Sequence, residues 1–256
     1  MPPPPWKIET GLASVLGKWV ASGAVRSCLT ADRSIAEKPG AYAPFPEDLH
    51  PSVVKALGAQ GVTRLYEHQA RALRAARARR HTVVATPTAS GKSLCFHLPV
   101  LDALANEPDA CAIYLYPTKA LSRDQEASVQ ELARASGLTI PAVVYDGDTP
   151  GDARRAARER TSIVMTNPDM LHAGVLPHHA SWARVLSKLR YVVVDELHTY
   201  RGVFGSHVAH VLARLKRAAE FHGSKPTFIA ATATIGNPRN HAARLFGEPE
   251  DNVELV

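Results

Sequence analysis

The chain contains little cysteine and no long hydrophobic run. Cys28, Cys95 and Cys111 are its three cysteines among 256 residues, and no two of them are close in sequence. This spacing argues against a zinc or iron–sulfur site within the chain and is typical of proteins from a reduced compartment. No apolar stretch approaches the roughly 20 residues of a membrane span. The start, Met1 followed by Pro2 to Pro5, lacks the basic residues of a signal peptide, so we expect a cytoplasmic protein without a membrane partner.

Acidic residues are also in the minority. The 24 Asp and Glu residues stand against 30 Lys and Arg residues, which gives a formal net charge of +6. A polyanionic partner is therefore plausible, although composition alone does not identify it. A chain of this length, with 45% hydrophobic residues, suits one large α/β domain or one domain plus an extension.

The pattern of the chain changes at about residue 45. Residues 1–45 carry a proline run and turn-rich patches, and we interpret them as an N-terminal extension. In residues 46–256, helical and strand-like segments alternate, with helices expected first at 51–59 and 67–79. Strands are predicted at 82–86, 111–116, 141–145, 162–166, 191–195 and 226–232. This alternation predicts the α/β class, with a mostly parallel sheet covered by helices on both faces.

A loop of small residues follows the first predicted strand and opens onto a helix with periodic leucines. Its sequence is Thr86-Pro87-Thr88-Ala89-Ser90-Gly91-Lys92-Ser93. Phosphate-binding P-loops occur in this context, because the loop amides and the helix N-terminus bind phosphate oxygens. We expect Lys92 to reach the β- and γ-phosphates and the Ser93 hydroxyl to hold Mg²⁺. The predicted nucleotide-binding residues of the loop are Thr88, Ala89, Ser90, Gly91, Lys92 and Ser93.

Two carboxylates follow a buried strand about a hundred residues later. The run 191–194 leads directly into Asp195 and Glu196, at the edge of a parallel sheet where ligands bind. We expect Asp195 to hold Mg²⁺ and Glu196 to orient or deprotonate the attacking water. With Lys92, these form the predicted catalytic set of a phosphoryl-transfer site.

A short segment before the P-loop, 65–69, carries an aromatic residue and an amide. Gln69 has the donor and the acceptor that an adenine edge requires. Tyr66 can stack on the base. We therefore add Tyr66 and Gln69 to the predicted nucleotide site.

Two further strands end at a predicted helix start, where exposed amides suit a backbone phosphate. The first helix start is capped by Thr118, and the second follows a Thr-x-Pro sequence. Between these two helix starts lies Gly147, which would let a backbone approach closely because it has no side chain. The predicted nucleic-acid residues are Pro117, Thr118, Lys119, Arg123, Gly147, Thr166 and Pro168. At the last strand, the hydroxyls of Thr232 and Thr234 are predicted to contact His198 and to couple the two sites.

The ordered set of motifs resembles the first RecA-like domain of superfamily 2 helicases, over about residues 45 to 245. Gln69 resembles the family's Q-type motif, and 86–93 resembles motif I. Motifs Ia and Ib correspond to 117–121 and 166–171. Asp195-Glu196-Leu197-His198 is similar to motif II, and Thr232-Ala233-Thr234 to motif III. Thr86 and Thr232 are mild departures from the family pattern.

The runs at 86–93 and 195–205 look closer still to the mitomycin-repair-type DExH helicases, which are related to RecQ-like repair helicases. The resemblance implies a RecA-like P-loop NTPase fold, ATP and Mg²⁺ as cofactors, and 3′-to-5′ movement on single-stranded or tailed DNA. It also implies a second RecA-like domain with an arginine finger, which this chain does not reach. Because such a finger contributes about 10³–10⁵ in rate, we expect residues 46–256 alone to turn ATP over poorly.

Three alternatives remain open at this point. The first is an RNA helicase, because backbone contacts alone do not distinguish RNA from DNA. The second is a module that binds nucleotide or nucleic acid without turnover. The third is a P-loop kinase, which would leave the paired helix starts unexplained. Oligomeric state is not indicated by the sequence.

Overall fold

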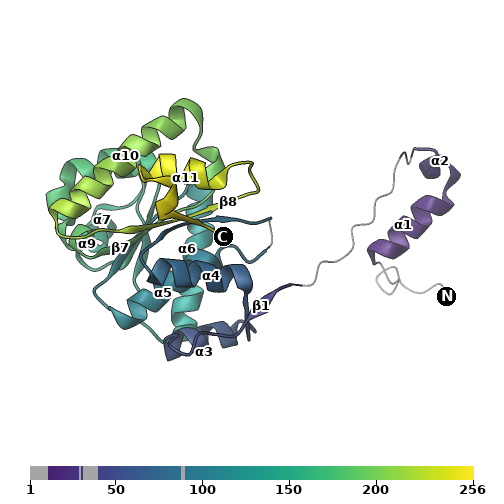
Figure 1. Ribbon diagram of the computed structural model, residues 1–256, viewed down its shortest axis with the longest axis horizontal. Helices are drawn as coiled ribbons and strands as arrows, with labels where there is room; N and C mark the ends of the chain where they lie inside the picture. The colour runs from purple at the N-terminus through teal and green to yellow at the C-terminus, as the bar shows by residue number, and fades with distance from the viewer. Residues whose placement is uncertain (1–10, 29, 31–39, 88–89) are drawn as a thin grey trace. The chain divides into compact units, whose positions relative to one another are not determined.

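The computed structural model describes residues 11–28, 30, 40–87 and 90–256. The chain divides into two compact units, 1–40 and 41–256 (Figure 1). The first contains helices α1 (Leu12–Ala21) and α2 (Gly23–Arg26). In the second, β1 (Tyr42–Ala43) pairs antiparallel with β2 (Leu65–Tyr66). The division into an extension of residues 1–45 and a domain of residues 46–256 stays a prediction.

A seven-stranded parallel sheet forms the centre of the larger unit. Its strand order is β5-β6-β4-β7-β8-β3-β9, and neighbouring strands pair in parallel throughout. The strands are β3 (His81–Ala85), β4 (Cys111–Leu115), β5 (Ala142–Val144), β6 (Ile163–Thr166), β7 (Leu189–Val194), β8 (Thr227–Thr232) and β9 (Val253–Leu255). The α/β class with a parallel sheet is confirmed. Strands β4 and β8 are buried along their whole length, as expected for strands with helices on both faces.

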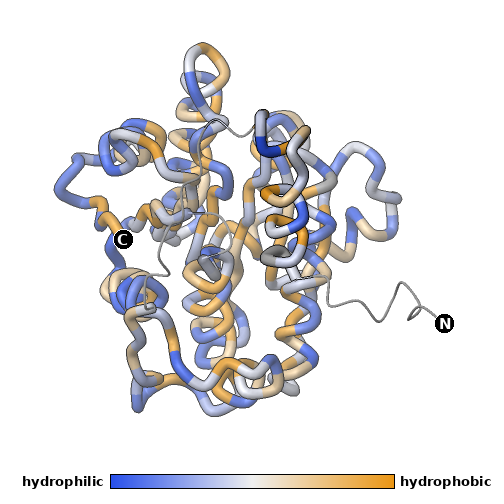
Figure 2. Tube along the Cα trace, turned by 90° about the vertical axis from the view of Figure 1, so that its right-hand side faces the viewer, coloured by the Kyte–Doolittle hydropathy of each residue, from blue (hydrophilic) through white to orange (hydrophobic). Residues whose placement is uncertain are grey.

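Helices cover both faces of this sheet (Figure 1). On one face α9 (Ala183–Ser187), α10 (Gly202–Phe221) and α11 (Pro238–Phe246) pack on one core. On the other face α4 (Glu67–Arg77), α5 (Leu94–Asn106) and α6 (Lys119–Ser136) pack on a second core. Successive residues of β4 serve the two cores in turn, since Ile113 belongs to the first and Tyr114 to the second. Hydropathy alternates along the helices in Figure 2, as helices with one buried face require.

The remaining helical segments are shorter. They are α3 (Pro51–Ala59), α7 (Gly151–Glu159), α8 (Pro168–Met170), the π-helix η2 (Leu171–Val175) and the 3₁₀-helices η3 (Leu176–Trp182), η4 (Leu197–Thr199) and η5 (Glu250–Asn252). Within the described ranges, no helix is both long and apolar enough to cross a membrane.

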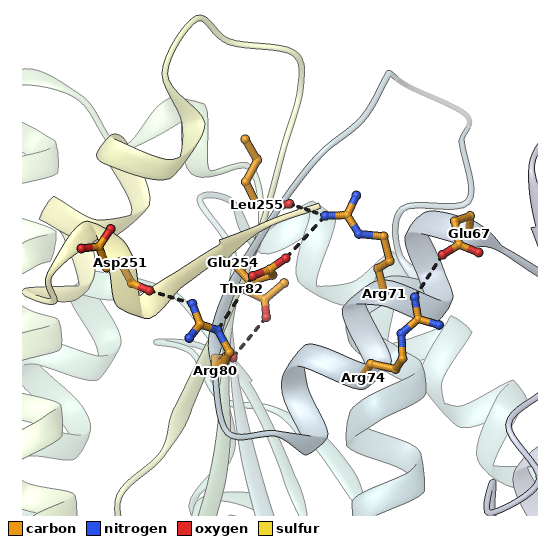
Figure 3. A network of polar contacts seen from close by, with 8 residues as sticks. All are labelled: Glu67, Arg71, Arg74, Arg80, Thr82, Asp251, Glu254 and Leu255. Atoms are coloured by element: carbon orange, nitrogen blue, oxygen red, sulfur yellow. Dashed lines mark hydrogen bonds and ion pairs between the residues drawn. The ribbon is translucent and has the colours of Figure 1, made fainter.

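The edge strand β9 is held in place by an arginine within α4 and another that follows this helix (Figure 3). Arg71 Nη2 donates to Leu255 O at 2.9 Å and lies 3.4 Å from Glu254 Oε1. Arg80 Nη2 donates to Asp251 O at 2.7 Å. These contacts support the pairing of β9 with β3 at the edge of the sheet.

Candidate nucleotide and nucleic-acid site

The P-loop connects β3 to α5 at the carboxyl edge of the sheet. Ser90 Oγ donates to Thr86 Oγ1 at 2.7 Å, which closes the loop on itself. Gly91 has φ +73, and a Cβ there would lie 2.7 Å from Gln69 Nε2, so both the backbone and the space require glycine. The predicted binding residues Thr88 and Ala89 lie outside the described residues.

Gln69 is bound to the P-loop at one end and to its own helix start at the other. Its Nε2 donates to Gly91 O at 3.0 Å, and its Oε1 accepts from Tyr66 N at 2.9 Å. His68 Nε2 lies 3.1 Å from Ser90 O. With only 4% of its surface exposed, Gln69 supports the loop in this structure, and its contact with adenine stays a prediction.

Tyr66 stands in a stack of rings beside the P-loop. Its ring centroid is 4.9 Å from that of Tyr42 and 5.4 Å from that of His68, and Arg64 lies over Tyr42 at 4.6 Å. Sequence reasoning missed Tyr42, because only the pairing of β1 with β2 brings it opposite Tyr66. Half-exposed aromatic surface is thus available next to the loop, as base stacking requires.

Asp195 follows β7 and is nearly buried. Its backbone N–H donates to Leu115 O at 3.0 Å, and 7% of the residue is exposed. Burial raises the pKa of Asp195 from 3.8 to about 6. Asp195 Oδ1 accepts a hydrogen bond from Glu196 N at 2.8 Å, which lowers the pKa. The negative charge of the Glu196 carboxylate raises the pKa, and the positive charge of Lys92 lowers it.

Glu196 adopts a left-handed backbone conformation, with φ 51 and ψ 43. Such a conformation is uncommon outside glycine and costs of order 1 kcal/mol, and it is concentrated at functional sites. The side chain of Glu196 is 36% exposed, and its Oε2 lies 3.2 Å from His198 Nδ1. Glu196 therefore meets solvent where Asp195 does not, which suits a group that handles water.

Lys92 joins the P-loop to the neighbouring strand end. Its Nζ donates to Thr232 O at 3.0 Å, across the adjacent strands β3 and β8. Strand β8 pairs with β7, which leads into Asp195, and the Lys92 charge lowers the pKa of that carboxyl group. Three predicted catalytic residues, Lys92, Asp195 and Glu196, therefore meet at one edge of the sheet.

The donor set fits a Mg²⁺ ion that arrives with nucleotide phosphates. Asp195 Oδ1 accepts from Glu196, which leaves Oδ2 for a cation or its water, and Ser93 offers a hydroxyl. In the described part of the chain, no group of three or more His, Cys, Asp or Glu residues could hold a metal on its own. Mg²⁺ commonly binds through one or two carboxylates together with phosphates.

The predicted contact of Thr232 and Thr234 with His198 is not formed as a hydrogen bond among the described residues. The Thr232 hydroxyl is fully buried and has no partner there, and Thr234 forms no bond to His198. The strand end does pack against η4, which contains His198. The coupling role of His198, Thr232 and Thr234 stays a prediction.

The start of α6 presents the expected backbone cap. Thr118 Oγ1 accepts from Leu121 N at 3.4 Å at the head of an 18-residue helix, and Lys119 and Arg123 are exposed beside Pro117. Lys119 Nζ lies 2.6 Å from Asp148 Oδ2. This pair brings the α6 start together with the turn that contains Gly147, which is exposed and has open space around its Cα.

The second predicted helix start differs in detail. Asn167, not Thr166, caps it, with Oδ1 accepting from Met170 N at 2.8 Å. Thr166 is 2% exposed and its hydroxyl donates to Tyr145 O, and Pro168 is also buried. The α-helix that follows has only three residues before a π-helical stretch, so its dipole is weaker than that of α6.

Comparison with known proteins gives consistent matches. The DEAD/DEAH box helicase family matches residues 66–241. The chain is 47% identical over 206 residues to the uncharacterised ATP-dependent helicase YprA of Bacillus subtilis, covering 80% of this chain and 28% of YprA. It is 40% identical over 186 residues to the ATP-dependent helicase HRQ1 of Saccharomyces cerevisiae, covering 71% of this chain and 17% of HRQ1.

A solved structure agrees with these relatives. The DUF1998 helicase MrfA, crystallised with DNA and AMPPNP, superposes with a TM-score of 0.84 at 45% identity. The superposition covers 87% of this chain and 31% of MrfA. The predicted RecA-like fold is confirmed. The chain spans less than a third of the length of each of these relatives.

Proposed function

This chain belongs to the DEAD/DEAH box helicase family, and we propose that it is the ATP-binding motor domain of an ATP-dependent DNA helicase of the repair type. The observation that carries the proposal is the meeting of Lys92 with the end of β8 and with Asp195, beside Glu196. A phosphate-binding lysine and two carboxylates at the same edge of the sheet are what phosphoryl transfer to water requires.

Each residue then has a distinct part in ATP hydrolysis. When ATP binds, Lys92 gives up its hydrogen bond to Thr232 O and contacts the β- and γ-phosphates instead. Ser93 and Asp195 would hold Mg²⁺, which would offset the phosphate charge. Glu196, which is more exposed than Asp195, orients the attacking water. Gln69 and Tyr66 hold the loop and offer the adenine a polar and an aromatic contact.

DNA is the proposed track. The start of α6 offers backbone amides, Lys119 and Arg123 to a phosphate, and the exposed Lys119–Asp148 pair can open to admit it. The crystallised relative MrfA binds DNA, which supports DNA over RNA. We propose single-stranded or tailed DNA as the substrate. The free cysteines Cys28, Cys95 and Cys111 support a cytoplasmic location.

Lys92→Ala tests the nucleotide site. We expect loss of binding of a fluorescent ATP analogue with an unchanged far-UV circular dichroism spectrum, because Lys92 contributes a single hydrogen bond to the fold. Lys216→Ala is the control, since Lys216 also donates to backbone carbonyls, those of Phe246 and Gly247. Wild-type ATP affinity in Lys92→Ala would contradict the assignment of the P-loop.

The choice of DNA is tested separately. A labelled single-stranded DNA bound to the chain is challenged with unlabelled DNA and with RNA of the same sequence. We expect the DNA to compete better. Equal or better competition by RNA would contradict the DNA assignment while leaving the nucleotide site untouched.

A further inference from the structure

A large cavity lies beyond the carboxylates, between the start of α10 and α11. Its volume is about 780 Å³, within the range of ligand-binding pockets. Tyr200, Arg201 and Val203 line it from the chain that leads out of the Asp195–Glu196 segment. Ile235, His241 and Arg244 line it from the chain that follows β8. None of these residues belongs to the nucleic-acid edge predicted from the sequence.

The charge of this cavity is positive. Arg201 and Arg244 are both exposed, and among its described lining residues there is no Asp or Glu. The other polar groups there are the amides of Asn237 and Asn240, the imidazole of His241 and the hydroxyl of Ser206. A concave site with two guanidinium groups and no carboxylate favours an anionic ligand.

Two exposed apolar side chains lie at the start of α10, one lining the cavity and the other next to it in the sequence. Val203, which lines the cavity, is 76% exposed. Phe204 follows it in the first turn of α10 and is 42% exposed, but it does not line the cavity. Phe204 lies beside Tyr200, with ring centroids 5.6 Å apart. Gly205 allows this arrangement, because a Cβ there would lie 2.4 Å from Tyr200 O. Because residue 205 has no side chain, the first turn of α10 packs closely against Tyr200. Phe204 stays at the surface, where a base can stack on it.

The cavity is also connected to the catalytic carboxylates. Tyr200 is 1% exposed, and its hydroxyl is buried with no hydrogen-bond partner in the described ranges. Burial raises the pKa of Tyr200, and the charges of Asp195 and Glu196 raise it further, so the phenol lies near both. From the other side, His241 Nε2 lies 3.1 Å from Leu197 O, immediately after Glu196.

We propose that this cavity is a second nucleic-acid subsite, which binds phosphates of a single DNA strand at Arg201 and Arg244, while a base stacks on the adjacent, exposed Phe204 outside the cavity. The proposal rests on the proposed function and extends it to a surface next to the catalytic carboxylates. The start of α6 and this cavity belong to loops at the same edge of the sheet, after β4 and after β7 and β8. A strand held in the cavity contacts Tyr200 and so reaches the segment that carries Asp195 and Glu196.

The first test is DNA binding by residues 1–256, measured by fluorescence anisotropy of a short labelled oligothymidylate over a range of salt concentrations. We expect the double variant Arg201→Ala and Arg244→Ala to bind about tenfold more weakly. The slope of log affinity against log salt should fall by roughly 0.7 for each lost phosphate contact. Phe204→Ala should weaken binding without changing the slope.

Arg217→Ala is the matched control. Arg217 is an exposed arginine on the same helix, roughly 24 Å from Arg201 at 1.5 Å per residue. It should leave affinity and slope unchanged. Thermal melting of every variant checks the fold.

The second test locates the strand directly. In a Cys28→Ser background, which removes the exposed cysteine, a photo-crosslinker is attached at Val203→Cys or at Phe221→Cys. The two positions are 76% and 77% exposed on the same helix. We expect cross-linking of the oligonucleotide from position 203 and not from 221.

Unchanged affinity and slope in the double variant, or equal cross-linking from both positions, would overturn the subsite. If Lys119→Ala still weakens DNA binding in that case, the proposed function stands and the cavity serves another partner. If the wild-type chain binds no oligonucleotide at any salt concentration, both proposals are contradicted.

Discussion

At the scale of single residues, Asp195 shows a conflict between stability and function. Burial of its carboxylate raises its pKa to about 6, so the folded chain binds a proton there more tightly than the unfolded chain does. For a raised acid pKa, folding stability falls as pH rises from about 4 through about 6. Near neutral pH the buried charge is retained at a cost that a bound cation would offset.

Asp195→Asn should therefore stabilise the chain without nucleotide near neutral pH. The difference between 3.8 and about 6 corresponds to at most about 3 kcal/mol. Urea unfolding at pH 7 measures it, and the gain should vanish below about pH 4, where the wild-type group is protonated in both states. Mg²⁺-dependent ATP binding should be lost.

Asp102→Asn is the contrasting variant. Asp102 is also buried, at 4% exposure, but its carboxylate is paired with Arg77 at 2.8 Å and accepts from His50 N. Removal of this charge should destabilise the chain by about 1–3 kcal/mol. A destabilised Asp195→Asn at pH 7 would contradict the assignment of an uncompensated charge.

Gly91→Ala should separate the strain of the P-loop from its contact with Gln69. Gly91 and Gly61 have nearly the same φ, +73 and +75, but only at Gly91 would a Cβ meet a neighbour, 2.7 Å away. Both variants should lose about 1 kcal/mol of stability through backbone strain. Only Gly91→Ala should weaken ATP binding, measured by titration with a fluorescent analogue. Equal ATP affinity in the two variants would count against the tight fit at Gln69.

At the scale of elements, a buried histidine ties the P-loop helix to the helix of the nucleic-acid edge. His97 on α5 lies 3.0 Å from Gln125 Oε1 on α6 and 3.3 Å from the Tyr114 hydroxyl on β4. Since Gln125 Oε1 can only accept, Nε2 carries the proton and Nδ1 accepts from the phenol. Burial lowers the pKa of His97 to about 4, so it is neutral at pH 7.

His97→Leu should cost about 1–3 kcal/mol at pH 7, because Gln125 and Tyr114 lose a buried partner. A lowered histidine pKa makes the wild-type chain lose stability as pH falls from about 6.5 to about 4. Asp195 acts in the opposite direction in the same window and therefore offsets part of the effect of His97. In urea unfolding, acidification should raise the stability of His97→Leu relative to the wild type and should lower that of Asp195→Asn relative to the wild type. Parallel profiles for the two variants would contradict both pKa assignments.

The elements that could be predicted are those whose signals are local. The strands β3 and β7 are β-branched runs next to a P-loop or a carboxylate pair, and both strands and their following loops lie where the sequence indicates. Strand β9 has three residues and is fixed by Arg71 from far along the chain, so no local pattern reveals it. The cap at Asn167 was missed because Thr166 has the same capping chemistry one residue earlier.

The residues of the site also fall into those with a local sequence signal and those without one. Lys92, Asp195 and Glu196 were found because each ends or follows a recognisable run, and a parallel sheet brings such ends to one edge. Tyr42 and the cavity beside Arg201 were not, because they depend on the pairing of β1 and on the packing of α10 against α11. Residues that meet through tertiary packing leave no spacing signal in one sequence.

At the scale of the whole molecule, the functional groups lie along one edge of the sheet. Lys92, the two carboxylates, the α6 start and the cavity all follow the carboxyl ends of strands in the order β4-β7-β8-β3. The relatives are several times longer than the aligned segment, since it covers 28% of YprA and 17% of HRQ1. We expect a second motor domain to close over this edge and complete the ATP site.

This expectation predicts that residues 1–256 bind ATP but hydrolyse it slowly, without stimulation by single-stranded DNA. A chain extended through a second motor domain should hydrolyse it about 10³-fold faster or more when DNA is present, because an arginine supplied from the second domain stabilises the transition state. Steady-state phosphate release from both chains, with and without DNA, measures this, and Glu196→Gln in the extended chain provides the background rate. Equal turnover by the two chains, indifferent to DNA, would mean that the edge is already complete and would remove the reason to treat this chain as half of a motor.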